Sequence, residues 1–273
     1  MPTWPALALS SLSAPELVPA TLSDYRITAI DETTHPGAWH VVFTTPADRD
    51  AAATALTRQF PDAVVRAVDV PDEDWVTRSQ AALTAVQIGG IIVAPPWDVP
   101  GTVPFGQCLV VIRPSMGFGT GHHATTRLCL SALQRVPVEG RAVIDVGTGS
   151  GLLAIAAGRL GAARVVAIDN DPDAIHAAEE NLELNRGADI TLRVDDLRAG
   201  IPGRFDLVLA NLTAGLLRAT ASRLRDQTAP GGRVILSGFM RGDEADVVAA
   251  FEGFAVRNRM EEEEWLCVTL QRA

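Results

Sequence analysis

A glycine-rich turn between an apolar run and a helix-like run is the segment whose residue types and spacing best indicate chemistry. The turn reads Asp-Val-Gly-Thr-Gly-Ser-Gly over residues 145–151 and follows the short apolar run 141–145. A second apolar run, residues 164–169, ends in Asp169. In parallel α/β sheets, such a turn lets a ligand approach the backbone, and an acid at the next strand tip binds ribose hydroxyls. The pattern therefore predicts a site for a cofactor that contains adenosine.

The spacing of the glycines distinguishes between two classes of cofactor. A dinucleotide-binding turn has a further glycine three residues after its second one, and that position is Leu152 here. The observed form resembles motif I of the S-adenosylmethionine-dependent methyltransferases, whose cofactor has no pyrophosphate. We expect Gly147 and Gly149 to pass close to its methionine part and ribose, and Asp169 to bind the ribose hydroxyls. A nicotinamide-dependent oxidoreductase and a non-catalytic cofactor-binding subunit are the alternatives.

Two further strand tips should reach the same edge of the sheet. Residues 205–211 form an apolar strand that ends in Asn211, and residues 193–196 end the intervening strand with Asp196. We expect Asp196 to bind the adenine amine and Asn211 to contribute to the site, although a cap or turn role is the alternative for Asn211. The Pro-Pro-Tyr signature of amino-group methyltransferases is absent because Leu212 follows, which disfavours base-flipping enzymes.

A loop rich in glycine precedes the first strand of this sheet. Residues 114–127 contain three glycines, two histidines and three threonines, and a helix-like run follows. We expect the loop to fold over the cofactor, with Phe118 covering an apolar part and Thr126 binding the methionine carboxylate; an ordinary connection is the alternative. Adjacent histidines without cysteines or a nearby carboxylate make a poor zinc site, so no metal is predicted. No catalytic acid or base is named, but neither His122 nor His123 is excluded as a proton acceptor.

The composition of the chain indicates which classes of binding partner and which cellular location to expect. The chain of 273 residues is 47% hydrophobic and has a formal net charge of −10, which disfavours a nucleic-acid partner and is compatible with a basic protein substrate. No apolar stretch approaches the ~20 residues of a membrane span. The three scattered cysteines are typical of a reducing cytoplasm. All 23 basic residues are arginine, so the chain contains no lysine. We expect a cytoplasmic monomer without membrane contact.

The chain divides into regions of different pattern. Residues 1–70 are typical of a small α+β unit, whereas residues 101–273 alternate strands and helices as an open parallel sheet requires. Residues 71–100 are expected to form a linker helix and a proline-rich connection. The acidic run 261–264 is expected in a solvated hairpin or loop before the last strand. The strands predicted in the first region are 25–30, 39–43 and 63–68, and its predicted helix is 48–60.

Taken together, these segments resemble the bacterial PrmA family, methyltransferases of ribosomal protein L-11. The resemblance covers about residues 72–273, whereas residues 1–70 match poorly. It departs from the family at Ser115 and Gly117, where glycine and alanine are usual. The segments that carry it are Phe118-Gly-Thr-Gly-His-His with Thr125-Thr126, the turn 145–151, Asp169-Asn-Asp-Pro172, Ala210-Asn-Leu212, Ile235-Leu-Ser-Gly238, and Glu73-Asp-Trp75 leading to Pro95-Pro96-Trp97.

The resemblance implies a fold and a reaction. The fold would be α/β, a class I methyltransferase (Rossmann-like) mostly parallel sheet with a small α+β N-terminal domain that recognises the substrate. Thr126, Gly147, Asp169 and Asn211 would contact S-adenosylmethionine. The methyl acceptors would be amino groups of ribosomal protein L-11, on lysine side chains, at the N-terminus, or both. A lysine methyltransferase of another protein and a small-molecule methyltransferase of the same fold are the alternatives.

Overall fold

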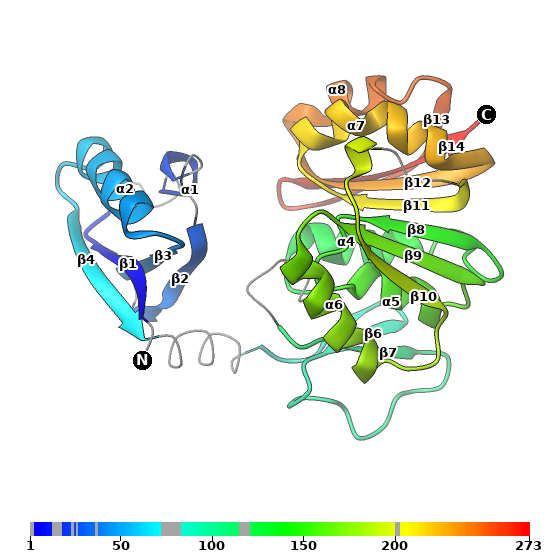
Figure 1. Cartoon of the computed structure of the whole chain (residues 1–273), viewed down its shortest axis with the longest axis horizontal. Coiled ribbons are helices and arrows are strands. Elements are labelled where there is room, and N and C mark those ends of the chain that lie inside the picture. The colour runs from blue at the N-terminus through cyan, green and yellow to red at the C-terminus, as the bar shows by residue number, and fades with distance from the viewer. Residues whose placement is uncertain are drawn as a thin grey trace. The chain divides into compact units, whose positions relative to one another are not determined.

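The computed structural model describes residues 3–12, 18–22, 25, 27–35, 38–71, 83–114, 121–199 and 203–273. They form two compact units that divide between Leu83 and Thr84 (Figure 1). Each unit has its own hydrophobic core. The smaller unit contains β1 (Thr3–Ser10), α1 (Val18–Thr21), β2 (Ile27–His35), β3 (Ala38–Phe43), α2 (Pro46–Gln59) and β4 (Val64–Pro71).

The smaller unit is a four-stranded antiparallel sheet with the strand order β2-β3-β1-β4. Helix α2 begins at a capping residue, Thr45, whose side chain accepts a hydrogen bond from the Asp48 backbone N–H. Its buried Leu56 belongs to one hydrophobic cluster with Leu7 and Phe43 of the sheet. The predicted strands and helix of this region are confirmed as β2, β3, β4 and α2.

Strand β1 has no counterpart in the sequence prediction. It contains one proline, two alanines and a single β-branched residue, Thr3, so the local pattern does not favour a strand. The strand is instead held by its neighbours, because it pairs with β3 on one side and β4 on the other. Leu7 and Leu9 on its inner face are buried in the core of the smaller unit.

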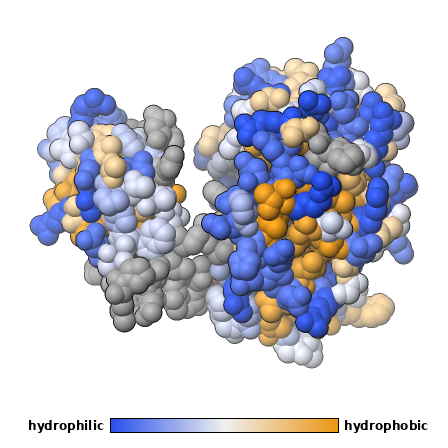
Figure 2. Space-filling model, in the orientation of Figure 1, coloured by the Kyte–Doolittle hydropathy of each residue, from blue (hydrophilic) through white to orange (hydrophobic). Residues whose placement is uncertain are grey.

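The larger unit contains a seven-stranded sheet with the order β10-β9-β8-β11-β12-β14-β13. The first five strands of this order are parallel to one another, and β14 is antiparallel to both of its neighbours. Hydrophilic side chains cover much of the visible surface (Figure 2).

The elements of the larger unit are β5 (Val86–Ile88), β6 (Ile91–Ala94), β7 (Cys108–Val111), α4 (Ala124–Leu133), β8 (Ala142–Val146), α5 (Leu152–Arg159), β9 (Arg164–Asp169), α6 (Pro172–Leu184), β10 (Ile190–Val194), η2 (Leu197–Ala199), β11 (Phe205–Asn211), α7 (Ala214–Gln227), β12 (Thr228–Met240), η3 (Arg241–Asp243), α8 (Glu244–Ala249), β13 (Phe254–Glu262) and β14 (Trp265–Arg272).

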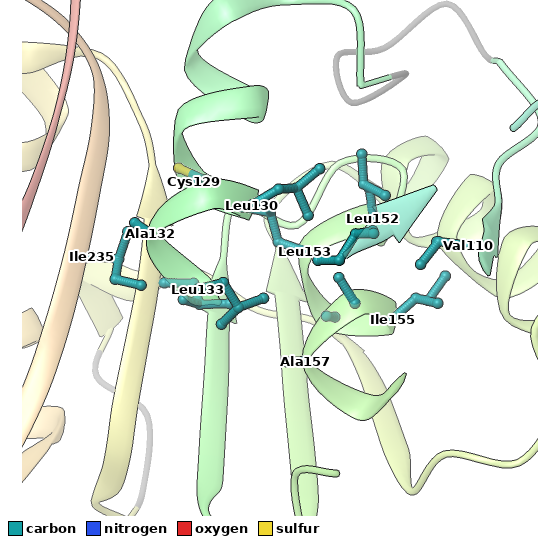
Figure 3. Packing of buried hydrophobic residues seen from close by; sticks show 14 of the residues in the cluster. Val110, Cys129, Leu130, Ala132, Leu133, Leu152, Leu153, Ile155, Ala157 and Ile235 are labelled. Carbon is teal, nitrogen blue, oxygen red and sulfur yellow. The ribbon is translucent and has the colours of Figure 1, made fainter. Parts of the chain in front are cut away.

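Helices cover both faces of this sheet, as parallel strands require. On one face, α4 and α5 pack against the sheet, and Leu133 and Leu153 lie in the same cluster as Ile235 of β12 (Figure 3). On the other face, Leu217 of α7 packs with Val208 of β11 in a second cluster. The central strands are therefore buried on both sides, which explains why their sequences are continuous apolar runs.

The segment predicted as a connection differs from that expectation. Residues 86–94 form β5 and β6, which join β7 in a separate three-stranded sheet. Their side chains explain the difference, because Ile91 and Val93 are buried in the cluster that also holds Val110 and the apolar residues of α5. The helix expected after Pro71 lies outside the described residues.

The acidic run 261–264 spans the end of β13 and the turn that leads into β14. Glu263 and Glu264 form the turn of the hairpin between β13 and β14, which confirms the predicted hairpin. Among the described residues, no helix is both long and apolar enough to cross a membrane. Within the same residues, no group of three or more histidine, cysteine, aspartate or glutamate side chains could hold a metal ion.

Candidate active site

A cavity of about 690 Å³ opens at the carboxyl ends of the parallel strands β8, β9 and β11. This edge of an α/β sheet is where ligands bind in the fold class. In Figure 2, a hydrophobic patch bordered by hydrophilic side chains is visible on the larger unit between the positions of α6 and α7. The cavity is lined by His123, Thr125, Val146, Gly147, Gly149, Ile168, Asp169, Asn170, Asp171, Ala174, Asp195, Asp196, Leu197, Arg198, Asn211, Leu212, Thr213, Leu216, Thr220, Gly238 and Trp265.

The glycine-rich turn forms one wall of the cavity and is attached to the neighbouring strand. The backbone N–H groups of Gly147 and Thr148 both donate to the carbonyl of Ile168, at 2.9 and 3.0 Å. Gly147 has a φ of +70°, and a Cβ at this position would overlap the side chain of Leu212. The left-handed backbone therefore favours glycine there, and any larger residue would also have to displace the end of the Leu212 side chain.

Asp169 connects this turn to the next helix. One carboxylate oxygen accepts from the Gly149 N–H at 3.0 Å, and the other accepts from the Asp171 N–H at 3.1 Å. Asp169 also lines the cavity. Because a carboxylate has about four lone-pair sites, two backbone bonds leave acceptor capacity for hydroxyl groups of a ligand. The structural and the ligand-binding roles of Asp169 are thus compatible.

Asp145 lies beneath the turn and is the most unusual charged group of the site region. It is buried, and one of its oxygens accepts from the Thr148 hydroxyl at 2.7 Å and from the Ala154 N–H at 3.2 Å. Its other oxygen has no partner in the described part of the chain. Burial raises the pKa of Asp145 to about 7, with a smaller contribution from the negative charge of Asp169.

Asp196 also lines the cavity and is the residue expected to bind the adenine amine. The guanidinium of Arg198 donates through Nε to both carboxylate oxygens, each at 3.1 Å, and the Arg198 N–H donates to one of them at 2.9 Å. These hydrogen bonds lower the pKa of Asp196. An adenine amine would therefore share the Asp196 carboxylate with Arg198.

A chain of polar contacts crosses from α4 to the tip of β11. His123 is the N-terminal cap of α4, and its Nδ1 lies 2.8 Å from the Thr125 hydroxyl oxygen. The same hydroxyl oxygen accepts a hydrogen bond from Nδ2 of Asn211 at 3.2 Å. The indole of Trp265 meets the His123 ring edge-on, with the ring centroids 5.0 Å apart. Burial, followed by the charge of Arg127, lowers the pKa of His123.

Most of the predicted site residues meet at the cavity. Gly147, Gly149, Asp169, Asp196 and Asn211 all line it. Thr126 is buried in the first turn of α4 and is not among the described lining residues, whereas its neighbour Thr125 is. Phe118 lies outside the described residues.

Trp265 is one of the lining residues that the sequence prediction did not assign to the site. It opens β14 and pairs with Met240 at the end of β12. Because β14 is antiparallel to β12, the start of β14 reaches the same edge of the sheet as the ends of the parallel strands. A tryptophan directly after a hairpin turn, in the strand expected to close the sheet, is the signal that could have identified it.

Comparison with known proteins agrees with this geometry. A sequence model of the family "Ribosomal protein L11 methyltransferase (PrmA)" matches residues 28–273. The chain belongs to this family. A ribosomal protein L11 methyltransferase of Myxococcus xanthus is 40% identical over 232 residues, which are 82% of this chain and 79% of the relative. One of Geotalea uraniireducens is 39% identical over 214 residues, 73% of this chain and 68% of the relative.

A solved structure shows the same fold. The crystal structure of ribosomal protein L11 methylase from Lactobacillus delbrueckii subsp. bulgaricus is 33% identical and superimposes with a TM-score of 0.65, covering 70% of this chain and 99% of that one. This PrmA-family enzyme is thus an S-adenosylmethionine-dependent protein methyltransferase with the predicted class I α/β fold. The cofactor expected from the glycine spacing is confirmed, and the oxidoreductase alternative is not favoured.

Proposed function

We propose that this enzyme transfers methyl groups from S-adenosylmethionine to amino groups of ribosomal protein L11, on lysine side chains, at the N-terminus, or both. The observation that supports the proposal is the family match over residues 28–273, together with relatives that are named for this substrate. The net charge of −10 suits a basic protein partner. We further propose that the enzyme works as a monomer in the cytoplasm.

The cavity suits the cofactor in size and in chemistry. Its volume of about 690 Å³ lies within the range of small-molecule sites. We assign the turn at Gly147 and Gly149 to the methionine part and ribose, because both glycines line the cavity and neither has a side chain that would keep a ligand away from the backbone. Asp169 would accept hydrogen bonds from the ribose hydroxyls, and Asp196 would bind the adenine amine.

Residues near α4 would complete the site. We assign Phe118 to covering the cofactor and Thr126 to binding its methionine carboxylate, both from the segment at the start of α4. Asn211, at the tip of β11, would face the acceptor amine. The role of Asn211 rests on its position at a strand tip, and the roles of Phe118 and Thr126 rest on the family resemblance.

The reaction requires little from the side chains beyond positioning. The bound cofactor supplies a methyl group that is already activated by its sulfonium charge. The amine must be neutral to attack, although an exposed lysine has a pKa of ~10.4. Burial in the cavity beside a cation lowers that pKa, so the enclosed site can bind the amine in its neutral form. An in-line arrangement of the amine and the methyl group then accelerates the transfer through orientation.

The smaller unit would hold the protein substrate. Among the described residues, every one that lines the cavity lies between His123 and Trp265, in the larger unit. The sheet and helices of residues 3–71 therefore have no described part in the cofactor site. A separate module of this kind suits the recognition of a macromolecule, whose acceptor groups must be presented one at a time to a small cavity.

Methyl transfer to purified ribosomal protein L11 is the direct test of the proposed function. The full chain and L11 are incubated with methyl-labelled cofactor, and the methylated residues are located by mass spectrometry. The enzyme contains no lysine, so every methyl-lysine that is recovered comes from the substrate. We expect label on lysine or N-terminal amines of L11. Label on other basic proteins of a ribosomal extract, with none on L11, would contradict the proposal.

Asp169→Ala should weaken the affinity for S-adenosylmethionine by about tenfold or more. The substitution removes two charge-assisted hydrogen bonds to the ribose, each of which contributes about 1.5–3 kcal/mol. The affinity is measured by calorimetry, and circular dichroism checks that the fold is kept. Asp173→Ala is the matched control, because Asp173 is an exposed carboxylate of the next helix and does not line the cavity. Unchanged affinity would show that Asp169 serves only to hold the backbone of Gly149 and Asp171.

A further inference from the structure

The polar contacts from α4 to β11 fix which atom of each group carries a proton. As the cap of α4, His123 accepts the Thr125 backbone N–H at Nδ1, at 3.4 Å. An imidazole nitrogen that accepts a hydrogen bond carries no proton, so neutral His123 is protonated at Nε2. The lowered pKa of His123, caused first by burial and then by Arg127, favours this neutral form.

The Thr125 hydroxyl lies between His123 and Asn211, so the position of the His123 proton determines how the Asn211 amide is oriented. Because Nδ1 of His123 is an acceptor, the hydroxyl 2.8 Å away must donate its single proton to it. The hydroxyl oxygen then presents only lone pairs to the other side. It accepts there from Nδ2 of Asn211, at 3.2 Å. A rotated amide would place its oxygen against the hydroxyl oxygen, and neither atom would have a proton to share.

The orientation of the Asn211 amide decides what the cavity offers to an amine. With Nδ2 bound to Thr125, the amide oxygen Oδ1 is the group that remains for a ligand. An amine that donates an N–H to Oδ1 keeps its lone pair available for attack. In the rotated amide, the N–H groups of Asn211 would bind that lone pair and block the reaction. The His123 ring also packs against the indole of Trp265, with the ring centroids 5.0 Å apart.

We propose that His123 and Thr125 are positioning residues that hold the Asn211 amide with its oxygen toward the acceptor amine of the substrate. The proposal rests on the proposed function, because it takes a neutral amine as the nucleophile. It adds a reason for a threonine at position 125 and a histidine at position 123. It also assigns His123 a role other than that of a proton acceptor for the substrate.

The protonation state of His123 is the first test, and it needs no substrate. Nitrogen-15 chemical shifts of the imidazole distinguish the two neutral tautomers in the full chain. We expect a proton on Nε2 and none on Nδ1 at pH 8, and we expect Thr125→Val to leave this cap bond in place. A proton on Nδ1 would reverse every donor in the chain of contacts and would overturn the proposal.

The second test separates positioning from binding and from structural loss. Thr125→Val keeps the shape of the side chain but removes the hydroxyl, so kcat with L11 should fall by about tenfold, the equivalent of one hydrogen bond, with unchanged affinity for S-adenosylmethionine. Thr125→Ser restores the hydroxyl and should restore most of kcat. His123→Asn should also retain activity, because an asparagine cap keeps an acceptor near the Nδ1 position.

Thr228→Val is the matched control. Thr228 is buried, and its hydroxyl donates to the Leu224 carbonyl at 2.8 Å at the end of α7, outside the cavity lining. We expect it to change stability without lowering kcat. Equal losses of kcat in the two valine variants, or no loss at Thr125, would overturn the proposal. Absence of wild-type transfer to L11 would instead reject the proposed substrate, and the tautomer measurement would still decide whether the contacts are arranged as described.

Discussion

We expect the larger unit of the wild-type chain to lose stability between pH 5 and pH 8, and Asp145→Asn should abolish most of this loss. Burial raises the pKa of Asp145 to about 7 in the folded protein, whereas an unfolded aspartate has a pKa of ~3.9. Across this window the folded state holds a proton that the unfolded state has released. The free energy of unfolding therefore falls as the pH rises toward 7 and becomes level above it.

The expected change in unfolding free energy follows from the pH range over which only the folded state holds the Asp145 proton. From pH 5 to the folded pKa is about two pH units, which corresponds to about 3 kcal/mol of unfolding free energy. Asparagine keeps an oxygen that can accept from Thr148 and Ala154 but has no proton to release. The variant should therefore be more stable than the wild type at pH 8, and the difference should shrink at pH 5.

Hydrogen exchange of core amides on β8 and β9 measures the unfolding free energy of the larger unit at each pH without involving the smaller unit. The exposed Asp226, changed to asparagine in the same way, controls for the removal of one charge. If the wild-type and Asp145→Asn profiles run parallel, the carboxylate is already ionised at pH 5, and the burial penalty has been offset by contacts other than those described.

The sheet and its cofactor edge could be predicted because the relevant signals are local in the sequence. The glycines of the turn at 145–151 have fixed spacing, and two of the parallel strands, β9 and β11, end in the polar residues Asp169 and Asn211. The topology of a doubly wound sheet then brings the strand ends to one edge, whichever helices lie between them. Sequence periodicity was sufficient for these elements because both faces of the strands are buried.

The features that could not be predicted depend on partners that are distant in the sequence. β1 becomes a strand through pairing on both sides, and β6 becomes one through contacts with β7. Whether Thr125 or Thr126 lines the cavity depends on the rotation of α4 about its axis, which is set by the packing of Leu130 and Leu133 in the hydrophobic cluster. Two adjacent threonines in a helix point in different directions, so a sequence motif that contains both cannot assign the contact.

Removing the smaller unit should separate cofactor binding from methyl transfer to the protein substrate. A chain limited to residues 84–273 keeps the whole cavity lining and both hydrophobic clusters of the larger unit. We expect its affinity for S-adenosylmethionine to match that of the full chain in calorimetry. Its kcat/KM for ribosomal protein L11 should fall by about 100-fold or more, because binding energy from contacts remote from the reacting atoms is lost.

The two measurements together distinguish loss of recognition from loss of folding. Substitution of Leu7 by aspartate in the full chain is the matched control, since Leu7 is buried in the core of the smaller unit and its replacement should disrupt that unit alone. It should reproduce the truncated chain in both assays. Full transfer to L11 by residues 84–273 would show instead that the larger unit recognises the substrate by itself. The acceptor segment of L11 would then be read by the residues around Trp265 and Asn211 at the cavity.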